Sequence, residues 1–167
     1  MRESCQSSVF SFQFSVVRNR PVGRLRFRTI HLLTITIANR QKTLRIDRRR
    51  MRLAIQAIVR DAGIANAQIS VAVVDDATIG KLHGEFLDDP EPTDVLSFVL
   101  EPPPALEGEV VASAEMAQSN AKRYDCTAEE ELLRYIIHGT LHLVGYDDTT
   151  PRKRAVMRKK EQEYLLK

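Results

Sequence analysis

The stretch Thr127–Gly145, TAEEELLRYIIHGTLHLVG, specifies one helix more completely than any other part of the chain. Thr127 and Glu130 have the spacing of a capping box, in which two side chains satisfy backbone N–H groups at the start of a helix. Apolar residues then recur at helical spacing and form a wide stripe. The stripe consists of Leu132, Leu133, Ile136, Ile137, Leu141 and Val144. Gly145 can adopt a left-handed conformation, so we expect a buried helix that ends in a sharp turn.

Strand and helix patterns alternate before this helix without a strict βαβ rhythm. Strands are expected at 34–38, 69–74, 95–100 and 110–112. Other helices are expected between Asp47 and Gly63, after a cap at Asp76, at 115–123, and after Thr150 with Pro151 in the first turn. The EPPPALEG segment at 101–108 fits neither element. The sequence therefore predicts an α+β fold with a small mixed β-sheet and about five helices, one of them a metal-binding helix near the C-terminus.

The bulk composition is that of one globular domain. The chain has 167 residues, of which 43% are hydrophobic and 28% charged, enough to bury one core. Its two cysteines, Cys5 and Cys126, lie far apart, which favours neither a disulfide framework nor a thiolate metal site. No apolar run approaches the roughly 20 residues that span a bilayer. We expect a soluble, cytoplasmic protein with no membrane association.

Residues 1–33 differ from the rest of the chain, because they are rich in serine and arginine and lack a clean apolar segment. We interpret them as a disordered extension or as the product of a start site placed too early, and residues 34–167 as the functional domain. Six arginines and one acid lie in the extension, so the remaining 19 basic and 21 acidic residues carry a net charge of −2. Net charge is therefore weak evidence for a nucleic-acid partner.

Two local basic clusters remain. The first comprises Arg40, Lys42, Arg45, Arg48, Arg49, Arg50 and Arg52, and the second Arg152, Lys153, Arg154, Arg158, Lys159 and Lys160. Such clusters can hold phosphates. They are equally typical of a solvated helix face, and the sequence does not choose between these interpretations.

The chemistry-bearing segment is HGTLHLVGYDD at 138–148. His138 and His142 are four residues apart, so their rings project from one helix face and can give a divalent ion two ligands. The turn at Gly145 could return Asp147 or Asp148 as a third ligand, and zinc fits such a set best. The competing interpretation is two core histidines at helical spacing, and HxxxH alone would favour it. The glycine turn and the acidic pair shift the balance to a metal site.

This segment resembles the HGxLHLxGYDH motif of the YbeY family, which are bacterial metal-dependent endoribonucleases. PTDVLSF at 92–98 looks like a second family motif, Gly108-Glu109 stands where the family has Gly-Asp, and Met157 and Glu161 match its M-x-x-x-E spacing. The resemblance covers about 34–167. It implies zinc-dependent cleavage of single-stranded RNA in ribosomal RNA maturation, at the small-subunit 3′ end, together with ribosome quality control. It also implies ribosomal RNA and ribosome-associated proteins as partners.

The resemblance assigns the metal ligands to His138, His142 and Asp148, the last standing where the family has a third histidine. A carboxylate can bind zinc, but two histidines and one carboxylate also suit non-haem iron. Leu87 stands where the family usually has an arginine that could bind phosphate. These two departures from the family motif, Asp148 and Leu87, leave open whether the protein is an active enzyme.

Several further residues are candidates for the site. Thr93, Asp94, Ser97 and His83 are candidate substrate-binding residues, although each could equally serve the fold. The catalytic groups are unknown: the metal would polarise a phosphoryl oxygen and either activate a bound water or assist a ribose 2′-hydroxyl, with Asp147 as a candidate base.

Three functions stay open at this point. The first is the endoribonuclease. The second is a catalytically weakened, ribosome-associated RNA-binding factor with a structural metal, and the third is a metal hydrolase with another substrate. A protease is disfavoured, because Gly139 stands where HExxH enzymes carry their glutamate base.

Overall fold

A mixed β-sheet organises the computed structural model, which describes residues 32–87, 91 and 93–167, except for the side chain of Leu87. The strands of this described part are β1 (Leu32–Asn39), β2 (Asn66–Val74), β3 (Val95–Glu101) and β4 (Ala105–Ser113). Their order in the sheet is β1-β2-β4-β3, with β1, β2 and β4 parallel and β3 antiparallel to β4. Parallel neighbours need crossover connections, which the helices supply.

β2 shows how the strands arise from their sequence. Every second residue is buried, and these residues are Ala67, Ile69, Val71 and Val73. Because side chains alternate between the faces of a strand, one face of β2 joins the main hydrophobic core. The β-branched residues of this stretch also suit a pleated, buried surface.

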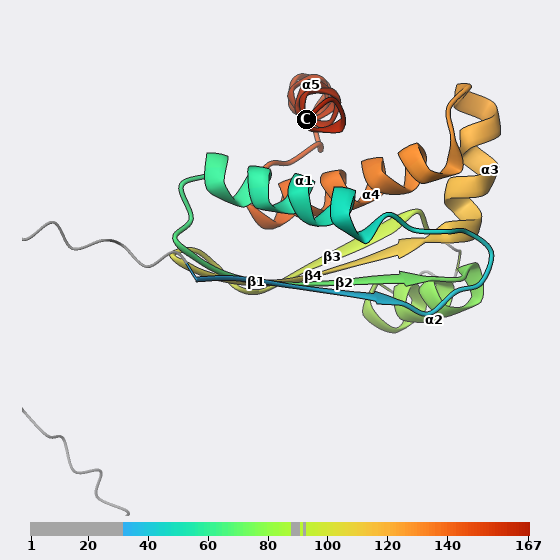
Figure 1. Ribbon diagram of the computed structural model, residues 1–167, viewed down its shortest axis with the longest axis horizontal. Helices are drawn as coiled ribbons and strands as arrows, with labels where there is room; N and C mark the ends of the chain where they lie inside the picture. Colours follow the sequence, from blue (N-terminus) through green and yellow to red (C-terminus); the bar gives the residue numbers. More distant parts are fainter. Residues whose placement is uncertain (1–31, 88–90, 92) are drawn as a thin grey trace, which may run out of the picture.

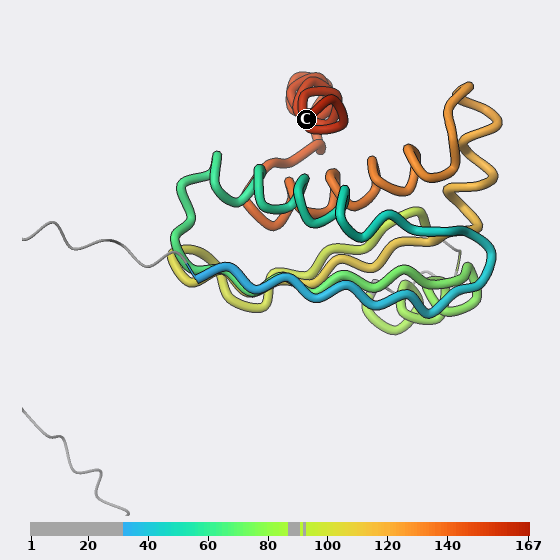
Figure 2. The backbone as a smooth tube through the Cα atoms, in the orientation of Figure 1, coloured from blue at the N-terminus to red at the C-terminus, as the bar shows by residue number. Residues whose placement is uncertain are grey.

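The helices of the described part lie on both sides of the sheet. They are α1 (Arg48–Asp61), α2 (Asp76–Leu87), α3 (Ala114–Tyr124), α4 (Ala128–Leu143) and α5 (Pro151–Leu165). In Figure 1, α1 and α4 cover one face of the sheet, α5 crosses outside them, and α2 lies against the opposite face. The backbone trace in Figure 2 shows α5 end-on above α1 and α4. A main core fills the space under α1 and α4, and a smaller one beside α2 contains Ile79, Leu96 and Val111.

The predicted α+β fold is confirmed: the described residues form a four-stranded mixed sheet and five helices, with His138 and His142 on a helix near the C-terminus. The expected capping box is present, because the Thr127 side chain and Glu130 satisfy each other's backbone N–H groups. Gly63 and Gly145 have the positive φ values, +71° and +95°, that their predicted turns require. The interpretation of residues 1–33 as an extension falls almost wholly outside the described residues.

Two local predictions were wrong. Residues 105–108 of the EPPPALEG segment belong to β4, where Leu106 is buried and residues 105–107 pair with 66–68 of β2. The prolines fill only the turn before it, so pairing with a neighbouring strand decides the rest. The cap of α2 is Asp75, whose Oδ1 accepts from the Thr78 N–H at 2.8 Å. The Asp76 carboxylate instead accepts a hydrogen bond from the Ser113 hydroxyl.

No helix in the described ranges is long and apolar enough to cross a membrane.

Gly139 lets α4 pack closely against the sheet. A Cβ at this position would lie 2.7 Å from Val110 Cγ1, 2.8 Å from Ser97 Oγ and 3.2 Å from Val95 Cγ2. The first two distances are shorter than packed atoms tolerate, so the helix would have to move away from β3 and β4. Gly139 sits beside His138, so that movement would also displace the histidine pair.

We predict that Gly139→Ala destabilises the protein, although alanine is the better helix former by about 1 kcal/mol. Overpacking costs about 1–3 kcal/mol, so the expected net loss is about 1 kcal/mol, or several degrees of melting temperature. Gly139→Val should lose more. Thermal unfolding followed by circular dichroism measures both, and a Gly139→Ala protein as stable as the parent would show that the contact is not tight.

Candidate metal centre

His138 and His142 bring their rings together on one face of α4. The ring centroids are 4.6 Å apart and the ring planes meet at 79°. The two Nε2 atoms are 3.0 Å apart. Residues four apart on a helix lie about one turn from each other, which explains this approach.

The hydrogen bonds of the two Nδ1 atoms determine whether the two Nε2 atoms carry a proton. His138 Nδ1 lies 2.8 Å from Glu161 Oε1, and His142 Nδ1 lies 3.0 Å from the carbonyl oxygen of Tyr146. Both partners only accept hydrogen bonds, so each Nδ1 carries the proton and donates. In the neutral rings both Nε2 atoms therefore present lone pairs to each other. A cation between them relieves that repulsion, which is the donor arrangement of a metal site.

Asp148 supplies the third candidate ligand, a carboxylate. Its Oδ2 is 3.9 Å from His138 Nε2, and its Oδ1 is 3.9 Å from His142 Nε2. Gly145 reverses the chain after α4, and Arg154 Nη1 donates to the Asp148 carbonyl at 3.0 Å. The turn and this hydrogen bond hold the carboxylate above the end of the helix.

The donor set fits a divalent ion. One ligand atom from each of His138, His142 and Asp148 lies within 4.8 Å of the others. Tetrahedral zinc with bonds of about 2.0–2.1 Å separates its ligand atoms by roughly 3.3 Å. The nitrogen pair is already near that separation, and the half-exposed carboxylate, whose two oxygens each lie 3.9 Å from one of the nitrogens, has to approach by at least roughly half an ångström. The structure thus brings together the three residues that the sequence proposed as ligands.

Glu161 is the residue of the site that sequence reasoning missed. Its side chain is 10% exposed, and it reaches His138 from α5. Its M-x-x-x-E spacing with Met157 was noted, but nothing assigned it a role. A glutamate four residues after an apolar methionine, on a helix that is mostly basic, was the available signal, because a carboxylate on the apolar face of a helix needs a partner.

The charge around His138 changes its acidity. Burial by itself would lower the pKa of His138, because it disfavours the charged ring. The hydrogen bond and the negative charge of Glu161, with smaller contributions from Asp148 and Asp94, outweigh burial and raise that pKa. Protons therefore compete with a metal for His138 to a higher pH than for an ordinary histidine.

The candidate substrate-binding residues fall into two groups. Asp94 lines a cleft with His138, and its carboxylate accepts from Thr93 Oγ1 at 3.2 Å and from the Val95 N–H at 3.0 Å. Ser97 lies under Gly139. The start of β3 thus approaches α4 beside the metal centre. His83 is on α2, on the other face of the sheet, where its Nδ1 is 2.8 Å from the Glu91 carbonyl oxygen (Figure 1).

Two further sequence candidates are not at the centre. Asp147 bonds the Lys153 ammonium and accepts from the Thr149 N–H at 2.6 Å. These contacts hold the pKa of Asp147 well below its ordinary range, so this carboxylate is a weak base. Leu87 is the last residue of α2, and its side chain lies outside the described part. The expected loss of a phosphate-binding arginine at this position therefore stays a prediction.

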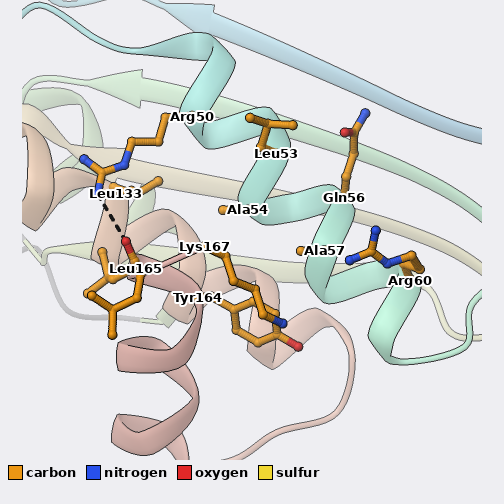
Figure 3. A pocket seen from close by; sticks show the side chains of 11 residues that line it. Arg50, Leu53, Ala54, Gln56, Ala57, Arg60, Leu133, Tyr164, Leu165 and Lys167 are labelled. Carbon is orange, nitrogen blue, oxygen red and sulfur yellow. Dashed lines mark hydrogen bonds between the residues drawn. The ribbon is translucent and has the colours of Figure 1, made fainter.

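Two cavities of similar size differ in their relation to the centre. A cleft of about 530 Å³ between α3, α4 and α5 includes His138 and Glu161 in its walls. A second cavity of about 520 Å³ lies between α1 and the end of α5, where Arg50 donates to the Leu165 carbonyl at 3.1 Å (Figure 3). None of the described residues around that second cavity is a candidate metal ligand. Of the two cavities, the first cleft is the one that reaches the candidate metal centre, through His138.

Fold and site together define an α+β protein of the class that can hold a divalent ion between a helix and the loop that follows it. Residues 36–167 match the family described as Endoribonuclease YbeY. The chain belongs to the YbeY family, as the motifs at 138–148 and 92–98 indicated.

Individual relatives agree with this assignment. An Endoribonuclease YbeY of Rhodopirellula baltica is 46% identical over 121 residues, which cover 70% of this chain and 62% of that protein. Another, from Salinibacter ruber, is 35% identical over 78% of this chain and 89% of its own length. The solution structure of TM1509 from Thermotoga maritima is similar with a TM-score of 0.58 at 28% identity, covering 79% of this chain and 87% of that one.

We predict that Glu161→Ala weakens metal binding about 10- to 100-fold, because the residue that orients and polarises His138 is lost. Glu161→Gln should lose less, because the amide oxygen still accepts a hydrogen bond. Glu163→Gln is the matched control, since Glu163 lies on the same helix but pairs with Lys160 at the surface. Zinc titration against a chromophoric chelator measures the affinities, and equal values for Glu161→Ala and Glu163→Gln would contradict the role.

We also predict how metal affinity depends on pH. A metal ion binds only the neutral form of His138. Metal affinity therefore falls as the pH decreases through the raised pKa of that residue, and this fall begins above about pH 6.5. Glu161→Gln removes the charge that raises this pKa, so its fall occurs at lower pH. Zinc titrations across neutral pH measure the two profiles, and superimposable profiles would refute the prediction.

Proposed function

We propose that this protein is a metal-dependent endoribonuclease that cleaves single-stranded RNA. The observation that supports the proposal best is the approach of the His138 and His142 Nε2 atoms to 3.0 Å, converging with Asp148 beside a cleft. Membership of a family described as endoribonucleases supports RNA cleavage as the reaction at this site.

The residues of the chain have separate tasks in this proposal. His138, His142 and Asp148 hold the ion, while Glu161 and the Tyr146 carbonyl fix the ring orientations. A divalent ion held there supplies a Lewis acid for a phosphoryl oxygen. The candidate substrate-binding residues Thr93, Asp94 and Ser97 support or border the cleft from β3 and the loop before it. Zinc is the proposed metal, because the donor separations suit it, and iron is the alternative for this ligand set.

The proposed biological setting is ribosomal RNA maturation in the cytoplasm, at the small-subunit 3′ end, together with ribosome quality control. Support comes from the family resemblance of the two motifs. Ribosomal RNA and ribosome-associated proteins are then the partners.

A second candidate is an RNA-binding factor in which the metal is structural. Asp148 favours it, because a carboxylate ligand partly neutralises the ion and weakens its action as a Lewis acid. The state of Asp147 also favours a structural metal. Its carboxylate is held by Lys153 and has little basicity, so it is poorly suited to act as a catalytic base.

Cleavage of an unstructured ribosomal RNA fragment by metal-loaded protein tests the proposal. We expect His142→Ala to reduce cleavage at least 100-fold and to lower the metal content found by elemental analysis, because one ligand is lost. Asp148→Ala should lower both as well. His83→Ala is the matched control, because it removes a histidine from the opposite face of the sheet, and it should cleave normally.

The other outcomes separate the competing functions. If the parent protein and His142→Ala show the same background cleavage while both bind RNA, the protein is a binding factor. If the parent is inert toward RNA but hydrolyses peptides or small phosphoesters, it is a hydrolase with another substrate.

A further inference from the structure

The cleft beside the metal centre continues away from it between three helices. α4 contributes Arg134 and His138, α5 contributes Arg158, and the end of α3 contributes Tyr124. His138 marks the metal end of the cleft. Arg134, Arg158 and Tyr124 line the same cleft but are not candidate metal ligands, so they are available to contact parts of a substrate other than the reacting phosphate.

Most charges in this cleft already have partners. Glu131 Oε2 lies 3.1 Å from Arg134 Nε, and Glu161 is bonded to His138. The Asp94 carboxylate accepts hydrogen bonds from its neighbours in the chain. Arg158 is exposed and forms no ion pair or hydrogen bond with the described residues. It is therefore the cation of the cleft that is available to a ligand.

The position of Arg158 relates it directly to the metal centre. It precedes Glu161 by three residues on α5, so the two side chains lie on neighbouring turns of the same helix face. Glu161 touches His138. Arg158 and Glu161 are thus separated by roughly 5 Å along the helix axis, and a ligand anion bound by Arg158 would lie on the side of α5 from which Glu161 reaches His138.

Tyr124 gives the far wall an exposed aromatic ring. It is 60% exposed at the last position of α3, and the Arg123 guanidinium carbon lies 5.9 Å from its ring centroid. An exposed tyrosine ring in the same cleft as an arginine without a partner among the described residues provides the two contacts that proteins use to bind single-stranded nucleic acid, with bases stacked on rings and phosphates on cations.

We propose that this cleft is the track by which single-stranded RNA reaches the metal centre, with Arg158 binding a backbone phosphate and Tyr124 stacking on an unpaired base. The inference rests on the proposed function and names two substrate-binding residues for it. Because a base in a duplex cannot stack on a side chain in this way, the track selects single strands over duplexes.

The phosphate contact is tested by binding of a fluorescent oligouridine to the full chain, treated with chelator so that the RNA stays intact. Arg158→Gln should weaken binding about threefold to tenfold and reduce the slope of log affinity against log salt by about 0.7, the value for one phosphate contact to a single strand. Lys159→Gln is the matched control: it removes the neighbouring exposed charge, which is not among the described residues lining the cleft. It should leave the slope nearly unchanged.

The stacking contact has its own variants. Tyr124→Leu should weaken binding about tenfold, whereas Tyr124→Phe should bind like the parent, because base stacking needs the ring and not the hydroxyl. All four side-chain changes are at exposed positions, and unchanged thermal unfolding establishes that each variant is folded. A duplex RNA of the same length should bind more weakly than the single strand and respond little to Tyr124→Leu.

The outcomes distinguish this inference from the proposed function. If Arg158→Gln and Lys159→Gln bind the oligouridine with equal affinity, or if Tyr124→Leu binds it like the parent, the inference of an RNA track is wrong even when the parent cleaves RNA. If the parent binds as expected but metal-loaded protein cleaves no RNA, the track stands and the endoribonuclease proposal fails. A parent protein that does not bind the oligouridine overturns both.

Discussion

The hydrogen bond between His138 and Glu161 is the interaction on which the site depends. It joins α4 to α5, it accounts for a nearly buried carboxylate, and it places the ring proton on Nδ1. The lone pair of Nε2 must then point toward His142. Without this contact the two helices could still pack, but the ring of His138 would be free to turn and its metal-binding nitrogen would not be defined.

Close packing of α4 on the sheet is the second constraint. Gly139 allows the helix backbone to approach Val110 and Ser97 at a distance that a side chain would prevent. The same residue lies next to His138, so the packing that stabilises the fold also sets the height of the candidate metal ligands above β3. α3 and α5 then stand beside α4 and leave the cleft between them, which explains why His138 borders a groove lined from three helices.

The agreement between sequence and structure is greatest where the determinants are local. The capping box of Thr127 and Glu130, the four-residue spacing of His138 and His142, and the turn at Gly145 each involve residues within one helix or its end, and each is present as predicted. The prediction for the start of β4 was wrong because its determinant is not local. These residues pair with β2, and the neighbouring prolines give no information on a partner that is distant in the sequence.

The sequence by itself determined the family, the mixed sheet with its helices and, through the resemblance to the family motif, the candidate ligand set of His138, His142 and Asp148. Only the tertiary structure gave the physical reason for choosing Asp148 over Asp147, because Lys153 holds the Asp147 carboxylate while that of Asp148 faces the histidines. It also assigned Glu161 to His138 and placed Arg158 in the same cleft. The physical reason is distance along the chain: helical and turn preferences act over a few residues, whereas the packing of α5 on α4 decides which side chains meet.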